Sequence, residues 1–335
     1  MDFIEFVDLA SERFGGRVLA ANDDFFAPKE NLLKPAAPVF DADKFTDRGK
    51  WMDGWETRRR RTPGYDWCVI KLGLPGQIRG VVVDTSFFKG NFPARASLEA
   101  CVASGTPSLE LLLAPAHPWT EILPESPLLG DSQNRFPISS EARFTHLRLK
   151  IYPDGGVARL RVYGEALPDW EAADSAGDEL DLAAVEHGGV ILASSDMFFG
   201  SPANLILPGP SLGMFDGWET RRRRGPGNDW AVIRLGAPGT IRRVVVDTSF
   251  FKGNFPESCS IEACHAAGAL RHDSTHANFA WSEVLPRTPL EADARRVFEK
   301  ELRSPGDVTH VRLNIFPDGG VARLRIFGQR AKQSR

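Results

Sequence analysis

The feature that most constrains this chain is a segment that occurs twice. Residues 53–101 and 216–264 align without a gap at an offset of 163, and 38 of the 49 aligned positions are identical. Unrelated segments of one fold do not share so much sequence, so the chain is an internal duplication. The repeat preserves polar loop residues as well as apolar ones, and a function is to be sought among these polar residues.

The duplication divides the 335 residues into two β-rich domains of ordinary size. The sequence predicts a first repeat at residues 1–165, an acidic and partly helical linker at 166–180, a second repeat at 181–330, and a polar tail at 331–335. The first copy carries a longer insertion around residues 34–50. Such length differences are expected in surface loops.

The overall composition excludes several classes of protein. A hydrophobic fraction of 42% and a formal net charge of −3 are typical of a soluble globular protein, and they argue against a nucleic-acid or membrane-surface binder. No apolar stretch is long enough to span a membrane, and the acidic N-terminus lacks the features of a signal peptide. The four cysteines form no C-x-x-C motif, so we expect a reduced, cytoplasmic protein.

Strand patterns dominate each repeat. Residues 67–72 and 78–84 read as two strands separated by a turn at L-G-L-P-G. In residues 146–151, apolar and polar side chains alternate, which predicts a strand with one buried face and His146 on the polar face. The turn at 152–156 then predicts a closing hairpin with residues 157–163. The order of these signals resembles the galactose-binding-like, discoidin-type jelly roll, so the expected fold is all-β, with two tandem β-sandwich domains.

Two runs of four arginines, at residues 58–61 and 221–224, are the most conspicuous charged segments. In an extended chain alternate side chains share a face, so at most two per copy can reach one ligand. We therefore take one alternating pair per copy as candidates for binding a carboxylate: Arg58, Arg60, Arg221 and Arg223. The alternative is a solvated segment whose arginines pair with acidic residues such as Glu56 and Asp66.

The loop at residues 84–93 is identical to the loop at 247–256. Core packing does not explain why its polar residues are unchanged, so they are candidates for a site. Asp84 and Asp247 are candidate proton-transfer groups, and the other polar residues are candidates for binding substrate: Thr85, Ser86, Asn91, Thr248, Ser249 and Asn254. The alternative is a loop held by local hydrogen bonds of the Asx or Ser/Thr type.

Two further pairs of equivalent residues could transfer protons. Glu99 and Glu262 lie on the polar side of a predicted strand, and His146 and His310 are histidines that match between the copies. Each has a structural alternative, a salt bridge for the glutamates and a packed histidine for the others. The sequence has no metal-ligand motif, so no metal-binding residues are predicted; the cofactor stays unknown, and a divalent cation is left open.

Several long strings resemble the allantoicase family: K-W-M-D-G-W-E-T-R-R at residues 50–59, D-W-C-V-I-K-L-G at 66–73, V-D-T-S-F-F-K-G-N-F-P at 83–93, N-D-D-F-F-A at 22–27 and P-D-G-G at 153–156. The resemblance covers essentially the whole chain. One departure is Tyr65, where the family pattern suggests histidine, with Asn228 at the equivalent position. The resemblance implies hydrolysis of allantoate to (S)-ureidoglycolate and urea, two jelly-roll domains and a homo-oligomer, with no nucleic-acid or membrane partner.

Two other functions fit a tandem jelly roll. One is a carbohydrate- or small-anion-binding module without catalysis, and the other is a scaffold for protein assembly. The free cysteines and arginine-rich loops favour the enzyme over a lectin. Release of urea from allantoate separates the enzyme from both alternatives.

Overall fold

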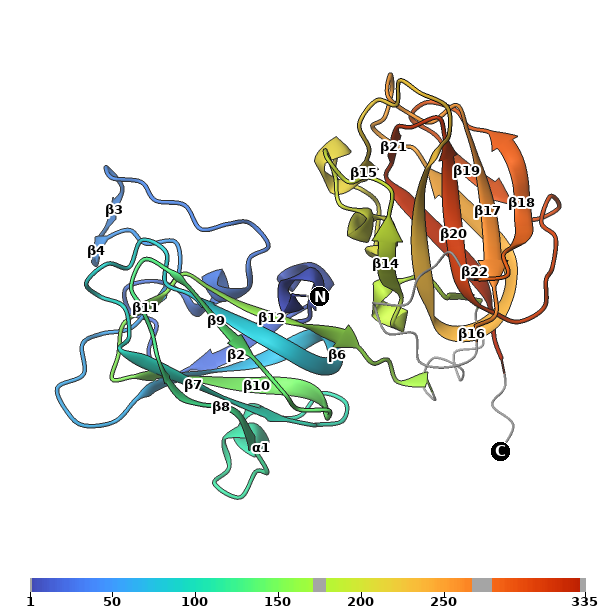
Figure 1. The fold of residues 1–335 in the computed structure, drawn as a ribbon. Coiled ribbons are helices and arrows are strands. Elements are labelled where there is room, and N and C mark those ends of the chain that lie inside the picture. The colour runs from blue at the N-terminus through green and yellow to red at the C-terminus, as the bar shows by residue number, and fades with distance from the viewer. Residues whose placement is uncertain (1, 171–178, 267–278, 332–335) are drawn as a thin grey trace. The chain divides into compact units, whose positions relative to one another are not determined.

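The computed structural model describes residues 2–170, 179–266 and 279–331 (Figure 1). The chain forms two compact units, Met1–Leu167 and Pro168–Arg335. Both units consist mainly of antiparallel strands, so the predicted all-β class with two tandem, similar units is confirmed. Residues 171–178 of the predicted linker and the tail from residue 332 lie outside the described residues.

The elements of the first unit follow in chain order. The strands are β1 (Val7–Asp8), β2 (Arg17–Ala21), β3 (Phe45–Thr46), β4 (Gly49–Lys50), β5 (Trp55–Glu56), β6 (Asp66–Asp84), β7 (Arg95–Cys101), β8 (Thr120–Pro127), β9 (Gln133–Pro137), β10 (Arg143–Tyr152), β11 (Gly156–Val157) and β12 (Arg159–Ala166). The helices are the 3-10 turns η1 (Phe3–Glu5), η2 (Glu12–Phe14) and η3 (Lys29–Leu33), and α1 (Leu109–Leu113).

The second unit repeats this order without β3, β4 and α1 among its described residues. Its strands are β13 (Leu180–Asp181), β14 (Val190–Ser194), β15 (Trp218–Glu219), β16 (Asp229–Asp247), β17 (Ser258–Cys264), β18 (Ser282–Pro289), β19 (Arg295–Phe298), β20 (Val308–Phe316), β21 (Gly320–Val321) and β22 (Arg323–Arg330). Its 3-10 turns are η4 (Val185–His187), η5 (Pro202–Ile206) and η6 (Met214–Asp216).

One long strand organises each unit. The first half of β6 pairs with β2 and β10, and its second half pairs with β9 and β12. β7 and β8 extend the first group, and β1 extends the second. The two halves of β6 therefore belong to the two layers of a β-sandwich. In the second unit β16 plays the same part, with β14 and β20 on one half and β19 and β22 on the other.

The continuity of β6 corrects the prediction of two strands separated by a turn. The L-G-L-P-G segment stays extended, and its glycines serve close packing instead of a reversal of the chain. A Cβ atom on Gly76 would lie 2.2 Å from the carbonyl oxygen of Glu165 in the neighbouring strand β12. Only a residue without a side chain fits there while the strand passes from one layer to the other.

The predicted closing hairpin is also wrong. β10 pairs with β6 and β7, whereas β12 pairs with β6 and β1. The turn at residues 152–156 therefore connects the two layers and not two neighbouring strands. Immediately after this turn, β11 pairs with β5, which carries the chain across the end of the sandwich.

The predicted alternation in β10 is confirmed for its apolar residues, because Leu147, Leu149 and Ile151 are fully buried. His146 was expected on the polar face, yet it is only 1% exposed. The segment after β7 covers this end of the sheet, where Leu112 of α1 packs in one cluster with Val69 and other apolar residues. The four cysteines are free and buried. Among the described residues, no helix has the length and apolar character needed to cross a membrane.

Candidate active site

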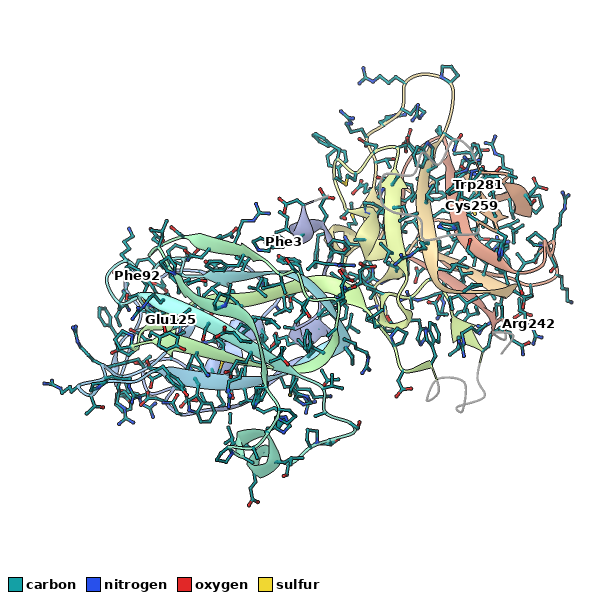
Figure 2. All side chains as sticks on the ribbon, turned by 60° about the horizontal axis from the view of Figure 1, so that its bottom comes forward. Phe3, Phe92, Glu125, Arg242, Cys259 and Trp281 are labelled. Atoms are coloured by element: carbon teal, nitrogen blue, oxygen red, sulfur yellow. The ribbon has the colours of Figure 1, made fainter. Side chains whose placement is uncertain are left out.

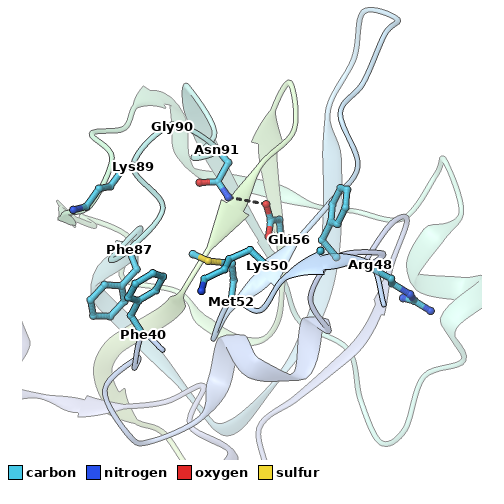
Figure 3. Close-up of a pocket in the computed structure, with 11 residues that line it drawn as sticks. Phe40, Arg48, Lys50, Met52, Glu56, Phe87, Lys89, Gly90 and Asn91 are labelled. Atoms are coloured by element: carbon cyan, nitrogen blue, oxygen red, sulfur yellow. Dashed lines mark hydrogen bonds between the residues drawn. The ribbon is translucent and has the colours of Figure 1, made fainter. Parts of the chain in front are cut away.

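Glu56 lies at one end of the first sandwich, where three segments distant in sequence meet. Its strand, β5, pairs with β11 on one side and forms an isolated bridge with Ala27 on the other. Asn91, near the end of the loop after β6, donates from Nδ2 to Glu56 Oε1 at 2.7 Å (Figure 3). The backbone carbonyl of Asn91 accepts from the amide of Gly156 at 2.7 Å, which fixes this loop to β11.

The second unit has the same arrangement. Glu219 of β15 pairs with β21 and forms a bridge with Gly200. Asn254 donates from Nδ2 to Glu219 Oε1 at 2.5 Å, and its carbonyl accepts from the amide of Gly320. The near-identity of the two copies therefore extends to a specific carboxylate–amide pair at the loop end of each unit.

Buried neighbours fix the direction of Glu56. Trp55 is fully buried, and its indole nitrogen donates to the carbonyl of Asp23 at 2.8 Å. Because side chains alternate along a strand, Glu56 points the other way, toward the pocket. On the neighbouring β11, a Cβ atom on Gly156 would lie 1.9 Å from the ring of Phe88, so glycine is required there.

A small apolar cluster supports the loop that carries Asn91. Met52, Phe88 and Ala158 are buried together, and Phe92, labelled in Figure 2, packs against them. The loop therefore carries Phe88 and Phe92 inward and presents Phe87 and Asn91 outward. This position follows from the alternation of phenylalanine with polar residues in the sequence.

The Glu56 carboxyl group is partly removed from solvent. Burial raises its pKa above the ordinary value of 4.5, and the hydrogen bond from Asn91 opposes that change only in part. A raised pKa favours the neutral carboxyl group, which is the form that can donate a proton. Because Oε1 accepts from Asn91, the proton of the neutral acid resides on Oε2.

A pocket adjoins this pair in each unit. The first has a volume of about 460 Å³ and is lined by Phe26, Phe40, Arg48, Gly49, Lys50, Met52, Glu56, Phe87, Lys89, Gly90 and Asn91 (Figure 3). The second has a volume of about 790 Å³ and is lined by Phe199, Glu219, Thr220, Arg222, Arg223, Gly253, Asn254, Phe255, Glu257, Pro289, Leu290, Pro317, Asp318 and Gly319. Four equivalent positions line both pockets: the glutamate, the asparagine, the preceding glycine and a phenylalanine.

The four predicted arginines take part in ion pairs within their own units. Arg58 pairs with Asp23 at 2.6 Å, and Arg60 pairs with the buried Asp66 at 2.7 Å. In the second unit the pairs are Arg221 with Asp196 at 2.9 Å and Arg223 with Asp229 at 2.5 Å. Arg223 also lines the second pocket.

A third arginine of each run is more available. Arg59 and Arg222 are exposed and form no ion pair within the described residues, and Arg222 lines the second pocket. Alternation of side chains along the run places Arg58 and Arg60 on one face. The structure shows that the acidic partners lie on that face and leave the intervening arginine free.

Most of the predicted polar residues of the 84–93 loop form hydrogen bonds within the fold. Asp84 accepts the amide of Ser86 at Oδ1 at 2.8 Å, and Thr85 donates to the carbonyl of Leu129 at 2.6 Å. The equivalent Asp247, Ser249 and Thr248 make the same bonds in the second unit. These residues line neither of the two pockets, whereas Asn91 and Asn254 do.

The predicted glutamates on the strands are held in ionic contacts. Glu99 on β7 contacts Arg148 at 2.5 Å and Lys150 at 2.6 Å. Burial alone raises the pKa of Glu99, but the hydrogen bonds from Lys150 and Arg148 outweigh it and hold that pKa below its ordinary value. Its equivalent, Glu262, contacts Arg312 at 2.5 Å.

The two matched histidines are buried in their sheets. His146 Nδ1 lies 2.8 Å from Thr145 Oγ1, and His310 Nδ1 lies 2.7 Å from Thr309 Oγ1. Burial lowers the pKa of His146, and the nearby charge of Lys71 lowers it further, which keeps the imidazole neutral. Neither histidine lines the two pockets.

Glu56 and Glu219 are not among the proton-transfer candidates predicted from the sequence. Both lie inside the identical D-G-W-E-T-R-R-R-R string, where they were considered only as partners for arginine. The sequence feature that could have indicated them is a glutamate directly after a tryptophan, present in both copies as Trp55-Glu56 and Trp218-Glu219. For a metal, no cluster of three or more histidine, cysteine, aspartate or glutamate side chains with suitable geometry occurs in the parts of the chain described.

Comparison with known proteins identifies the family and the same duplication. The family model "Allantoicase repeat" matches residues 7–167 and again residues 180–331. The chain is 51% identical over 324 residues to "Probable allantoicase 1" of Burkholderia mallei, covering 96% of this chain and 94% of the relative. It is 49% identical to "Allantoicase" of Dictyostelium discoideum, covering 96% and 86%. A crystal structure of allantoicase from Saccharomyces cerevisiae superposes with a TM-score of 0.79 at 38% identity, covering 96% of this chain and 93% of that one.

The fold and the loop-end sites are thus those of a repeated β-sandwich protein with paired carboxylate–amide pockets. The chain belongs to the allantoicase family.

Proposed function

We propose that this chain hydrolyses allantoate to ureidoglycolate and urea at the loop end of its sandwich, with the glutamate of the D-G-W-E-T string as the proton-transfer group. Family membership and the names of the relatives support the reaction. The observation that carries the choice of residue is the half-buried Glu56 with its raised pKa, hydrogen-bonded to Asn91 inside a pocket. The oligomeric state is proposed separately, as a homo-oligomer, on the resemblance alone.

The substrate defines what the site must supply. Allantoate has a central carbon that carries one carboxylate and two ureido groups. The nitrogen lone pair of one ureido group can expel the other, provided that an acid protonates the leaving nitrogen. A base must then deprotonate the water that adds to the resulting imine-like carbon. The site therefore needs a cation for the carboxylate, an amide-binding group for the ureido arms and one proton-transfer group.

The residues around Glu56 can meet these needs. In its neutral form, Glu56 donates a proton from Oε2 to the leaving nitrogen, and urea departs. The resulting carboxylate then accepts a proton from water as the oxygen bonds to the central carbon, which regenerates the acid and yields ureidoglycolate. The step consumes one water and releases one urea, with no net change at Glu56.

Asn91 has two proposed tasks. Its Nδ2 holds Glu56 Oε1 and so fixes the carboxyl group, and its remaining amide groups can hydrogen-bond a ureido arm. Phe26 lines the same pocket and limits access of water to the carboxyl group. Cations line both pockets, among them Lys50 in the first and Arg222 in the second.

The direct test of the reaction is a urea-release assay on allantoate with the purified chain, before and after treatment with a chelator. Production of ureidoglycolate and urea in equal amounts is expected. Absence of urea release with every common divalent cation supplied would contradict the proposed activity.

Amide substitutions separate Glu56 from the carboxylates predicted from the sequence. Asp84 and Glu99 are engaged in the fold, so we expect Asp84→Asn or Glu99→Gln to change kcat less than about threefold in a folded variant, as for any group that transfers no proton. A loss of about 100-fold in either variant would return that residue to the catalytic list. Steady-state kinetics on allantoate measures both, and circular dichroism controls for folding.

The pH dependence follows from the direction of the pKa shift. Glu56 must be protonated to expel urea, so kcat should fall as pH rises through its raised pKa. Asn91 stabilises the ionised form, and its loss in Asn91→Ala should raise the pKa further. The alkaline limb of the kcat–pH profile should therefore move to higher pH in that variant. A limb that stays in place or moves to lower pH would exclude Glu56 as the titrating acid.

A further inference from the structure

The two loop ends share the glutamate–asparagine pair but differ in the segment that leads to it. Equivalent arginines hold this segment by its carbonyl groups. Arg159 donates from Nε to the carbonyl of Ala36 at 3.0 Å, and Arg323 donates from Nε to that of Gly209 at 3.3 Å. Residues 34–39 therefore correspond to residues 207–212.

A second pair of equivalent hydrogen bonds shows where the first unit has additional residues. The amide of Val39 donates to Asp53 Oδ2 at 3.1 Å, as the amide of Leu212 donates to Asp216 Oδ2 at 3.0 Å. Lys50 and Gly213 then stand at the same distance before these aspartates. The additional ten residues of the first unit are thus residues 40–49, a narrower segment than the sequence alone indicated.

These residues fold back over the first pocket. They contain β3 and the first residue of β4, which pairs with β3, and Phe40 stacks on Phe87 with ring centroids 5.6 Å apart and an interplanar angle of 20°. The covering is visible in the exposure of equivalent side chains, since Phe26 is 37% exposed whereas Phe199 is 62% exposed. The first pocket therefore has a covered phenylalanine at a position where the second pocket has an exposed one.

The charges that line the two pockets also differ. Three cations and one carboxylate line the first pocket: Arg48, Lys50, Lys89 and Glu56. Two cations and three carboxylates line the second: Arg222, Arg223, Glu219, Glu257 and Asp318. A small anion is attracted to the first pocket and repelled by the excess of carboxylates in the second.

Lys50 is the best-placed cation in the first pocket. Its ammonium group lies 4.4 Å from the ring centroid of Phe45 and 5.2 Å from that of Phe40, and it donates to the carbonyl of Ala42. Figure 3 shows Lys50 among the residues that line this pocket. No carboxylate pairs with it among the described residues, so its charge is not neutralised by the fold.

The other two cations of this pocket are less suited to hold a substrate. Arg48 already donates to the carbonyl of Phe25 at 2.7 Å and lies over the ring of that residue. The side chain of Lys89 is 78% exposed and lies 3.8 Å from Asp131. In the second unit, the position of Lys50 is taken by Gly213, which has no charge to offer.

We propose that the two repeats have diverged in function: the first pocket carries the turnover of the enzyme, Lys50 binds the substrate carboxylate there, and the second pocket contributes little to hydrolysis. This inference rests on the proposed function, because it takes the substrate to be the carboxylate of a diureido acid. The inserted residues 40–49 supply the cover, and Lys50, which follows them directly, supplies a cation where the second unit has Gly213.

Matched single variants test the division between the repeats. Glu56→Gln is expected to lower kcat on allantoate by at least about 100-fold, whereas Glu219→Gln is expected to lower it less than about threefold. Equal losses in the two variants, or a larger loss in Glu219→Gln, would overturn the inference while leaving the proposed reaction in place. Loss in neither variant, with the parent chain active, would overturn the proposed site itself. A parent chain that releases no urea would instead contradict the proposed function.

The role of Lys50 has its own test. Lys50→Met should raise KM for allantoate by about 10- to 100-fold, as expected for loss of a charge-assisted hydrogen bond, with kcat within about threefold. Lys50→Arg should restore most of the affinity because it keeps the charge. Lys252→Met changes an exposed lysine that lines neither pocket, so it is the control and should leave KM unchanged. An unchanged KM in Lys50→Met, or an equal rise in this control, would show that Lys50 does not bind the carboxylate.

Discussion

Replacing both loop-end glutamates, in the variant E56Q/E219Q, should lower kcat for urea release from allantoate by about 10²- to 10⁴-fold, the range of general acid–base catalysis. Glutamine keeps the shape and the hydrogen bond to asparagine, but it cannot donate a proton to the leaving nitrogen or accept one from water. KM should change much less than kcat, because the cation that holds the carboxylate is untouched.

This result must be separated from loss of folding. The double variant should show the circular dichroism spectrum and the unfolding midpoint of the parent chain, since both glutamates are partly exposed at the loop end. The matched control is E99Q/E262Q, which changes two glutamates on the sheets and should retain activity. A double variant with more than a third of the parent kcat would remove the glutamates of the D-G-W-E-T strings from the mechanism.

Replacing Arg159 by methionine should destabilise the first unit by about 3–5 kcal/mol, because it removes the buried partner of the Asp53 carboxylate and leaves beside it only the half-exposed Lys34, 3.5 Å away. Arg159 is 1% exposed and contacts Asp53 at 2.6 Å. Burial raises the pKa of Asp53, but the hydrogen bonds from Arg159 and the Val39 amide, together with the charges of Arg159 and Lys34, outweigh it and hold that pKa below its ordinary value. Guanidinium chloride unfolding, fitted with one transition per unit, measures the loss.

Two comparisons sharpen this prediction. The variant D53N/R159M carries no buried unpaired charge, because the Lys34 side chain that loses its partner is half-exposed, and it should be less destabilised than R159M alone. Arg323→Met should cause a similar loss in the second unit, where Arg323 contacts Asp216 at 2.6 Å. A loss below about 1 kcal/mol in R159M, or a double variant less stable than the single one, would contradict the account of this pair.

The pH dependence of the same pair has a definite sign. Because the pKa of Asp53 is depressed in the folded chain, the stabilisation by Arg159 is present above the pKa of an unfolded aspartate, about 3.9. It is lost as pH falls through the lower, folded pKa. The difference in stability between the parent chain and R159M should therefore shrink on acidification.

Local patterns in the sequence predicted the elements well. The period-two alternation around Leu147 and the duplication identified the strands and the number of units. The pairing of strands distant in sequence could not be predicted. A single strand as long as β6, with glycines inside it, has the same local pattern as two strands separated by a turn. After Pro153 the chain forms β11, which pairs with β5, about 100 residues earlier in the sequence. No local sequence pattern predicts this pairing.

The site was predictable in part. Asn91 was selected because packing did not explain its retention in both copies, and it does line the pocket. Arg58 and Arg60 were predicted to bind substrate because alternation places them on one face. In the fold they form ion pairs with Asp23 and Asp66, and only the structure shows that these carboxylates lie at contact distance. Glu56 looked like one more member of a charged string, because burial and the contact with Asn91 become visible only once three distant segments are brought together.

The most direct test of the central claim is a crystal structure of the slow variant E56Q with allantoate bound. The account predicts the ligand in the first pocket, with a ureido nitrogen within hydrogen-bonding distance of residue 56, an amide contact to Asn91, and the carboxylate on Lys50. Allantoate bound at another place, such as the sheet face of Glu99 and Arg148, would contradict it.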